Sequence, residues 1–159
     1  MLLIKSQRDM LLSPLLSVSG IVEKRHTLPI LSNVLLEKIG DQLTFLATDI
    51  EIQITTIMNG AIGENDGAMT VSAKKLQDIL RLLPENSEVS LSFDEKRLLI
   101  RTEKSRFSLQ TLPASDFPRM VISGDNSKKI TVTQKQFHLL RSEERRVEKE
   151  CRSRWSPYH

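Results

Sequence analysis

Apolar and polar residues alternate with a period of two over several short stretches of the chain, which predicts β-strands. Gly40-Asp41 separates two of these stretches and is a hairpin turn signal. In a third stretch Ile50, Ile52 and Ile54 alternate with polar residues, which predicts one buried and one exposed face. We expect strands at residues 2–5, 33–39, 42–48, 51–59, 68–72, 88–93, 97–102 and 105–109.

Two further stretches have the three-to-four-residue spacing of amphipathic helices. Ser6 precedes the first and can act as its N-cap, and Gly20 ends it. Ser72 precedes the second and is expected to cap it in the same way. The apolar positions are Met10, Leu11, Leu15 and Val18 in the first helix, and Leu76, Ile79, Leu80 and Leu83 in the second.

The predicted strands repeat along the chain at an offset of 55 residues, while the two serine caps are 66 residues apart. The matched pairs are Val34 with Val89, Leu36 with Leu91, Leu43 with Leu98, Phe45 with Ile100, Ile52 with Phe107 and Ile54 with Leu109. The repeat predicts an α+β domain of two β-α-β-β-β units, with about eight strands and two helices packed on the sheet.

A longer repeat begins near the end of the chain, where Thr133-Gln134-Lys135 corresponds to Ser6-Gln7-Arg8 at an offset of 127, followed by Phe137 and Leu139. We therefore expect a first domain at 1–122, and a linker with the start of a truncated second domain at 123–140. Residues 141–159 have no periodicity and are similar to a common sequencing-adapter oligonucleotide read through as protein. We expect this tail to be non-native; a natural charged helix is the other interpretation.

The composition is that of a globular protein. The 159 residues suffice for one domain with a core, and no apolar run has the length of a membrane span. The residues after Met1-Leu2-Leu3-Ile4 are polar, so we expect no signal peptide. The single cysteine, Cys151, lies in the tail and forms no internal disulfide. These features favour a cytoplasmic protein without a membrane partner.

The net charge of +3 is unevenly distributed. Residues 141–159 hold six of the 23 Lys/Arg and four of the 20 Asp/Glu, which leaves 17 basic and 16 acidic residues in the rest. Since the remainder is nearly neutral, attraction to a polyanion depends on where the charges lie.

No catalytic or cofactor-binding constellation is recognisable. The histidines, His26, His138 and His159, lack metal-ligand spacing to other ligands, and we expect no cofactor or metal. Asp49 and Glu51 are the one pair of carboxylates to consider, because residues two apart on a strand point to the same face. The other interpretation is that Asp49 is a turn residue and Glu51 is solvated.

The basic residues of the loop after the first helix and of the second helix's polar side suit phosphate contacts that do not depend on sequence. An ordinary solvated helix face is the competing interpretation. The candidates for DNA binding are Arg8, Lys24, Arg25, Lys74 and Arg81, with Lys75 beside them.

Three motifs in order, TLPILSN, ATDIEI and RFSLQTLPASDFP, closely resemble the N-terminal domain of the bacterial beta sliding clamp family, the beta subunits of DNA polymerase III. The resemblance covers roughly residues 1–140. It implies a non-catalytic processivity factor of DNA replication, an accessory subunit of a DNA-directed DNA polymerase and nucleotidyltransferase complex. In this family two subunits of three domains form a ring homodimer that encircles double-stranded DNA, with helices lining the hole.

The resemblance also implies roles for particular residues. Arg25 falls on the family's DNA-contact arginine, and Lys74 on another basic contact. The subunit interface maps to Lys75, Ile79 and Leu83 on the second helix and to the strand 104–109, with Lys104, Arg106 and Leu109. The sites for the DNA polymerase III core and the clamp loader belong to domains missing here.

Two other functions remain open from the residues. One is a small metal-dependent nuclease or phosphotransfer domain that uses Asp49 and Glu51. The other is a free-standing interaction module that uses the 104–109 strand to add a partner strand.

Overall fold

A computed structural model describes residues 2–22, 28–120, 128 and 130–141 of the chain. The chain divides into two units, 1–120 and 121–159, which are described separately below. Among the described residues, no helix has the length and apolar character needed to cross a membrane.

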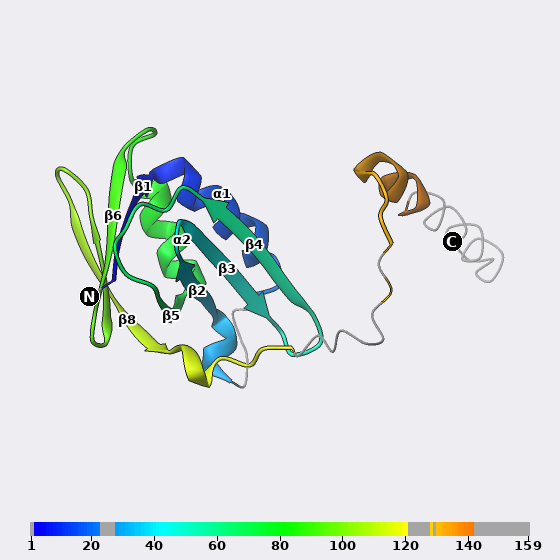
Figure 1. Ribbon diagram of the computed structural model, residues 1–159, viewed down its shortest axis with the longest axis horizontal. Coiled ribbons are helices and arrows are strands. Elements are labelled where there is room, and N and C mark those ends of the chain that lie inside the picture. The colour runs from blue at the N-terminus through cyan, green and yellow to red at the C-terminus, as the bar shows by residue number, and fades with distance from the viewer. Residues whose placement is uncertain (1, 23–27, 121–127, 129, 142–159) are drawn as a thin grey trace, which may run out of the picture. The chain divides into compact units, whose positions relative to one another are not determined.

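The first unit contains a single antiparallel sheet of eight strands in the order β1-β6-β7-β8-β5-β2-β3-β4 (Figure 1). The strands are β1 (Leu2–Gln7), β2 (Asn33–Ile39), β3 (Gln42–Thr48), β4 (Gln53–Asn59), β5 (Gly67–Ser72), β6 (Glu88–Asp94), β7 (Arg97–Arg101) and β8 (Arg106–Pro113). The predicted α+β class with eight strands and two packed helices is confirmed. β8 runs four residues beyond its predicted end, because its last residues pair with β5.

The internal repeat is visible in the strand pairing. The first strand of each copy pairs with the second strand of the other copy. β1 pairs with β6, and β5 pairs with β2 in the same register: Ile4 lies opposite Leu91, as Met69 lies opposite Leu36. These pairs set the offset between the first strands at 65 residues. The predicted 66 was wrong, because it equated Ser6 with Ser72.

The offset between the two copies changes again at their last strands, β4 in the first copy and β8 in the second. Ile100 lies opposite Phe107 and Leu98 opposite Leu109, while their counterparts Phe45 and Leu43 lie opposite Thr56 and Met58. The hairpin β3–β4 is longer than β7–β8 by the two pairs Ala47–Ile54 and Thr48–Gln53. The predicted matches of Ile52 with Phe107 and Ile54 with Leu109 were therefore wrong.

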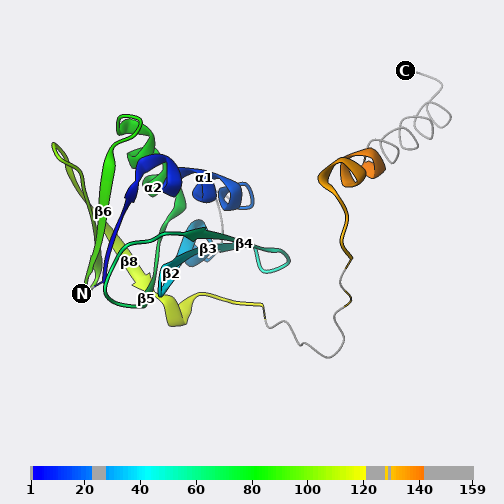
Figure 2. The same ribbon diagram turned by 45° about the horizontal axis from the view of Figure 1, so that its top comes forward.

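The sheet curls so that its two terminal strands approach each other. Lys5 of β1 forms an antiparallel bridge with Ile62, three residues after β4, and its N–H donates to the Ile62 carbonyl over 2.9 Å. Figure 2 shows the two half-sheets, β1-β6-β7-β8 and β5-β2-β3-β4, inclined towards each other around the helices. This curl gives the sheet an inner face against the helices and an outer face.

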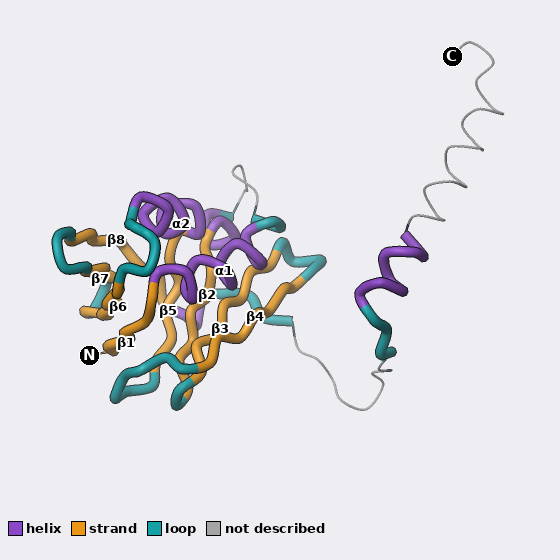
Figure 3. The backbone as a smooth tube through the Cα atoms, turned by 90° about the horizontal axis from the view of Figure 1, so that it is seen from above, coloured by secondary structure: helices purple, strands orange, loops and turns teal. Residues whose placement is uncertain are grey.

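Both helices lie on the inner face (Figure 3). Helix α2 (Ala73–Leu82) has Ser72 as its N-cap, as predicted, and the Lys75 N–H donates to the Ser72 hydroxyl over 3.4 Å. Helix α1 (Arg8–Ser19) has Gln7 as its N-cap and begins one residue later than the predicted cap at Ser6 implies. Ser6 belongs to β1 and is not the cap, since β1 pairs with β6 as far as Gln7.

One continuous core fills the space between the helices and both half-sheets. Leu11, Leu15 and Val18 of α1 are buried in it, but Met10 is half-exposed, contrary to prediction. Leu76, Leu80 and Leu83 are buried and Ile79 packs against them. Fully burying a side chain of this size contributes roughly 1.5–3 kcal/mol, so this core carries most of the fold's stability.

A smaller apolar cluster covers the outer face of β5-β2-β3-β4 only. Phe117, after the 3-10 helix η2 (Ala114–Asp116), is 4% exposed and packs with Leu35 of β2 and Leu46 of β3. Next to it, Arg119 pairs with Glu37 at 2.6 Å. Residues 114–120 are called the strap below, because they cross β5, β2 and β3 on this face.

The segment between β3 and β4 is a tight turn and not the start of a strand, as the alternation of isoleucines had predicted. Asp49 Oδ1 accepts from the N–H of Glu51 and of Ile52, at 3.0 and 2.7 Å. Ile50 has φ +81°, and both Ile50 and Ile52 are more than half exposed. The side-chain hydrogen bonds of Asp49 therefore override the alternating pattern.

The second unit is described only at 128 and 130–141, with a helix at 134–141. Thr133 caps this helix: the Gln136 N–H donates to the Thr133 hydroxyl, and the Thr133 N–H to Gln136 Oε1, at 3.2 and 3.1 Å. This reciprocal pair is a capping box. The tail residues Cys151 and His159 lie outside the described residues.

Candidate nucleic-acid interface

The most basic surface of the helix pair is the beginning of α2. Lys74 and Lys75 are exposed in its first turn, which contains no acidic residue. Cations are unfavourable at this end of a helix, because the free N–H groups and the aligned peptide dipoles already make it positive. The same features make it suitable for an anion. The second helix therefore carries a concentrated positive end that stability does not require.

A groove of about 390 Å³ lies beside this end of α2. It is lined by Ser19, Val22, Ser32, Ser72, Ala73, Lys74 and Gln77. Its walls come from the end of α1, the start of α2 and the 3-10 helix η1 (Pro29–Ser32). Hydroxyl and amide groups beside a lysine suit a phosphate oxygen, which accepts hydrogen bonds from all of them.

The predicted contacts Lys24 and Arg25 lie outside the described residues, as does His26. They follow Val22, which lines the groove, and the chain is described again from Leu28. Arg81 is exposed at the opposite end of α2 from Lys74, in the last turn.

Arg8 differs from the other predicted contacts because its side chain is only 13% exposed. Its Nε donates to the Leu80 carbonyl over 2.8 Å, and its Nη1 lies 2.7 Å from Asp9 Oδ1. It is the only basic residue of α1. A hollow on the surface of this helix is lined by Asp9, Leu12, Ser13, Leu16 and Ser17. Positive charge is thus concentrated on α2.

The predicted subunit interface surrounds the seam between β8 and β5. Only 111–113 of β8 pair with β5, and 106–110 pair with β7 alone. This leaves one edge of residues 106–110 without a strand partner among the described residues. The sequence indicated an edge strand at 104–109, but β8 lies inside the sheet, between β7 and β5, and only its first part has an open edge.

A groove of about 700 Å³ lies along this open edge. Lys75 of α2 and Leu109 of β8 line it together, as do Lys96 and Arg97. Ile79 is half-buried nearby on α2, whereas Leu83 is 5% exposed and belongs to the core. An exposed apolar and cationic groove beside an open strand edge can accept an added strand with acidic neighbours.

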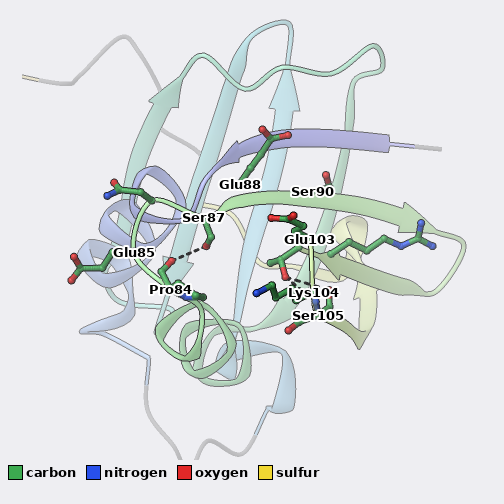
Figure 4. Close-up of a pocket in the computed structure, with 11 residues that line it drawn as sticks. Pro84, Glu85, Ser87, Glu88, Ser90, Glu103, Lys104 and Ser105 are labelled. Atoms are coloured by element: carbon green, nitrogen blue, oxygen red, sulfur yellow. Dashed lines mark hydrogen bonds between the residues drawn. The ribbon is translucent and has the colours of Figure 1, made fainter.

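Lys104 lies in the turn between β7 and β8, apart from this groove. Figure 4 shows it with Ser105 across a hollow from the turn Pro84–Ser87. The hollow measures about 780 Å³ and contains two basic residues, Arg101 and Lys104, and three acidic ones. Because the acidic residues outnumber the basic ones, this hollow does not suit a polyanion. Arg106, at the start of β8, is exposed.

The structure does not support a metal site at Asp49 and Glu51. Both residues lie in the β3–β4 turn, and Asp49 Oδ1 already accepts two backbone N–H groups. Among the described residues, no group of three His, Cys, Asp or Glu side chains could hold a metal ion.

Sequence reasoning missed a buried lysine. The Lys38 side chain is 1% exposed; its Nζ donates to the Gly40 carbonyl over 2.7 Å and lies 3.9 Å from Asp66 Oδ1. Asp66 also accepts from the Gly40 N–H over 2.8 Å, so these groups join the β2–β3 turn to the segment before β5. The signal was present: Lys38 follows Val34 and Leu36 at the inward positions of an alternating strand.

Residues 2–121 match the sequence model of a family described as the N-terminal domain of the DNA polymerase III beta subunit. A beta sliding clamp of Pseudomonas putida KT2440 is 46% identical over 112 residues, which cover 70% of this chain and 30% of that protein. The beta sliding clamp of Pseudomonas aeruginosa PAO1 is 41% identical over 134 residues, covering 84% and 36%.

Solved structures give the same match. The crystal structure of the DNA polymerase III subunit beta from Pseudomonas aeruginosa has a TM-score of 0.79 at 40% identity, and the alignment covers 85% of this chain and 36% of that one. Caulobacter crescentus pol III beta has a TM-score of 0.77 at 43% identity with the same coverage. The chain thus spans about a third of the length of its relatives, 30% and 36% for the two clamps above.

Proposed function

Because the chain belongs to the family of bacterial beta sliding clamps, the beta subunits of DNA polymerase III, we propose that the complete protein is a processivity factor of DNA replication. In this proposal it is not an enzyme. It forms a ring homodimer in the cytoplasm, encircles double-stranded DNA without reading its sequence, and tethers the polymerase III core after a clamp loader has placed it. The polymerase and loader sites belong to the remaining domains.

The observation that carries this proposal for the domain itself is the positive beginning of α2. Two exposed lysines, the positive end of the helix dipole and the adjacent polar groove all favour phosphate. We propose that Lys74, Lys24 and Arg25 contact the phosphate backbone, and that Arg81 adds a weaker contact. Arg8, the remaining predicted contact, lies at the other end of α2, and its donors are already engaged with the Leu80 carbonyl and Asp9.

The contact is tested by Lys74→Gln in the complete subunit, with Lys5→Gln as the matched control. Lys5 is exposed and alternates with the inward-facing Ile4, so it lies on the opposite face of the sheet from the helices. Direct binding to a short primed duplex is followed by fluorescence anisotropy across a salt series. Losing one phosphate contact should make the slope of log K against log salt shallower by about 0.9.

We expect this change for Lys74→Gln and none for Lys5→Gln. Equal effects of the two substitutions would mean that only net charge matters. No change in either slope would remove Lys74 from the interface.

For the subunit contact, we propose that the open edge at 106–110, with Lys75, Ile79 and Leu109, receives a strand of the second subunit. Leu83, Lys104 and Arg106 are proposed to support it from the core and from the adjoining turn. Leu109→Asp would place a charge in this contact, and light scattering should then find monomers. Leu99→Asp is the control, because Leu99 lies on the neighbouring strand opposite Ser108 and faces the other side of the sheet. A stable dimer of Leu109→Asp would contradict the assignment.

A further inference from the structure

Arg8 lies where the first turn of α1 meets the last turn of α2. Its backbone N–H donates to the Ser87 carbonyl over 2.9 Å, in the turn that follows α2. Its side chain donates to the Leu80 carbonyl and pairs with Asp9. The side-chain hydrogen bond therefore joins the beginning of α1 to the last turn of α2, while the backbone hydrogen bond holds the same residue to the turn that leads into β6.

The end of α2 needs such a donor. The last four carbonyls of a helix have no partner within it, and the aligned peptide dipoles make this end negative. No glycine follows to form a left-handed cap; the C-cap Leu83 is extended and Pro84 comes next. The Leu83 N–H reaches the Leu80 carbonyl over a long 3.3 Å. The Arg8 guanidinium supplies the shorter hydrogen bond and the complementary charge.

The two helices run antiparallel, because Ser19 near the end of α1 and Ala73 at the start of α2 line the same groove. α2 is only ten residues long, roughly 15 Å at 1.5 Å per residue. A helix this short behaves as one rigid rod, so the contact that fixes its last turn also fixes the direction in which Lys74 and Arg81 are presented.

We infer that Arg8 is a positioning residue that holds the last turn of α2 and thereby aims the basic groups of this helix, and that it is not itself a phosphate contact. The inference rests on the proposed function, because it names what orients the proposed DNA surface. In this role the shape of the Arg8 guanidinium matters as well as its charge. A lysine has no planar fork with which to reach the Leu80 carbonyl and Asp9 together.

The test compares Arg8→Lys, which keeps the charge, with Arg8→Gln, which removes it, in the complete subunit. Two quantities are measured for each: the urea midpoint of unfolding and the salt slope of binding to the primed duplex. We expect both substitutions to lower the urea midpoint to a similar extent. Both should also weaken duplex binding by the same factor at every salt concentration, with the slope unchanged, because the basic groups of α2 are held less firmly while no phosphate contact is lost. Both should also raise amide exchange in the last turn of α2.

A phosphate contact would give the opposite result. Arg8→Lys would then behave like the unaltered protein, and Arg8→Gln would make the slope shallower by about 0.9 with no loss of stability. That result overturns the inference, as does full rescue of the urea midpoint by lysine. Asp9→Asn provides a milder variant if Arg8→Gln does not fold; it should lower the midpoint slightly and leave the slope unchanged.

The Lys74→Gln variant separates this inference from the proposed function. If its slope does not change, the proposed DNA surface fails. The urea midpoints of Arg8→Lys and Arg8→Gln still decide whether Arg8 holds the helix.

Discussion

The two half-sheets are copies of one design that differ in what covers their outer faces. Leu35 lies opposite Leu46 in β5-β2-β3-β4, and Ser90 lies opposite Arg101 at the equivalent ladder position of β1-β6-β7-β8. The leucine pair is buried under Phe117 of the strap, whereas the serine and arginine line an open hollow. The comparison shows that the repeat keeps most inward positions apolar, while outward residues follow whatever lies on them.

The inner face of the two halves is the strongest test of this equivalence. Leu36 and Leu91 occupy the same inward ladder position and are both buried in the shared core. Leu36→Ala and Leu91→Ala should each lower the free energy of unfolding by about 3 kcal/mol, from lost burial and the cavity left behind. Urea unfolding of the two variants measures this. If one substitution lowered the free energy of unfolding by more than twice as much as the other, the two copies would not be structurally equivalent.

The outer faces should respond very differently. Phe117→Ala removes the ring that covers Leu35 and Leu46, and should cost about 3 kcal/mol. Arg101→Ala, at the repeat position of Leu46, removes an exposed side chain and should change stability by no more than about 0.5 kcal/mol. Urea midpoints of both variants test the contrast. A small effect of Phe117→Ala would show that the strap does not stabilise this half.

A small effect is also expected at an inward position where one copy has a lysine and the other has an aromatic residue. Lys38 lies opposite Leu43, as Phe93 lies opposite Leu98. Lys38→Met keeps the buried stem and removes the ammonium group, and should change stability by less than about 1 kcal/mol, because burying a charge largely cancels what its pairing contributes. Thermal unfolding measures the change. A loss as large as that of Leu36→Ala would show that the Lys38 hydrogen bonds hold the hairpin.

Much of the fold could be predicted from the sequence, because inward positions repeat. The alternation at 33–39 and 42–48 predicts strands with those same bounds, and Ser72 predicts the start of α2. Prediction failed where hydrogen bonds, local in one case and between strands in the other, outweighed the pattern. Asp49 forms a turn where Ile50 and Ile52 indicated a strand, and β1 continues through Ser6, which the sequence indicated as a helix cap.

The candidate site was less predictable than the fold. Lys74 is exposed on α2 as the spacing indicated. The contact of Arg8 with Leu80 could not be predicted in the same way, because the two residues are far apart in the chain. The burial of Lys38 was also missed, since a charged residue is ordinarily assigned to the exposed face. The Arg8 contact depends on how the two helices pack, and the burial of Lys38 depends on its hydrogen bond to Gly40 and its proximity to Asp66; periodicity alone describes neither.

The most direct test of the central claim is whether the complete protein is held on DNA by topology. After loading onto a nicked circular duplex, the bound fraction is measured before and after a restriction enzyme linearises the circle, at constant salt. A ring should remain on the circle and slide off the free ends of the linear molecule. Equal retention on circular and linear DNA would show that binding depends on affinity alone, and would contradict a sliding clamp.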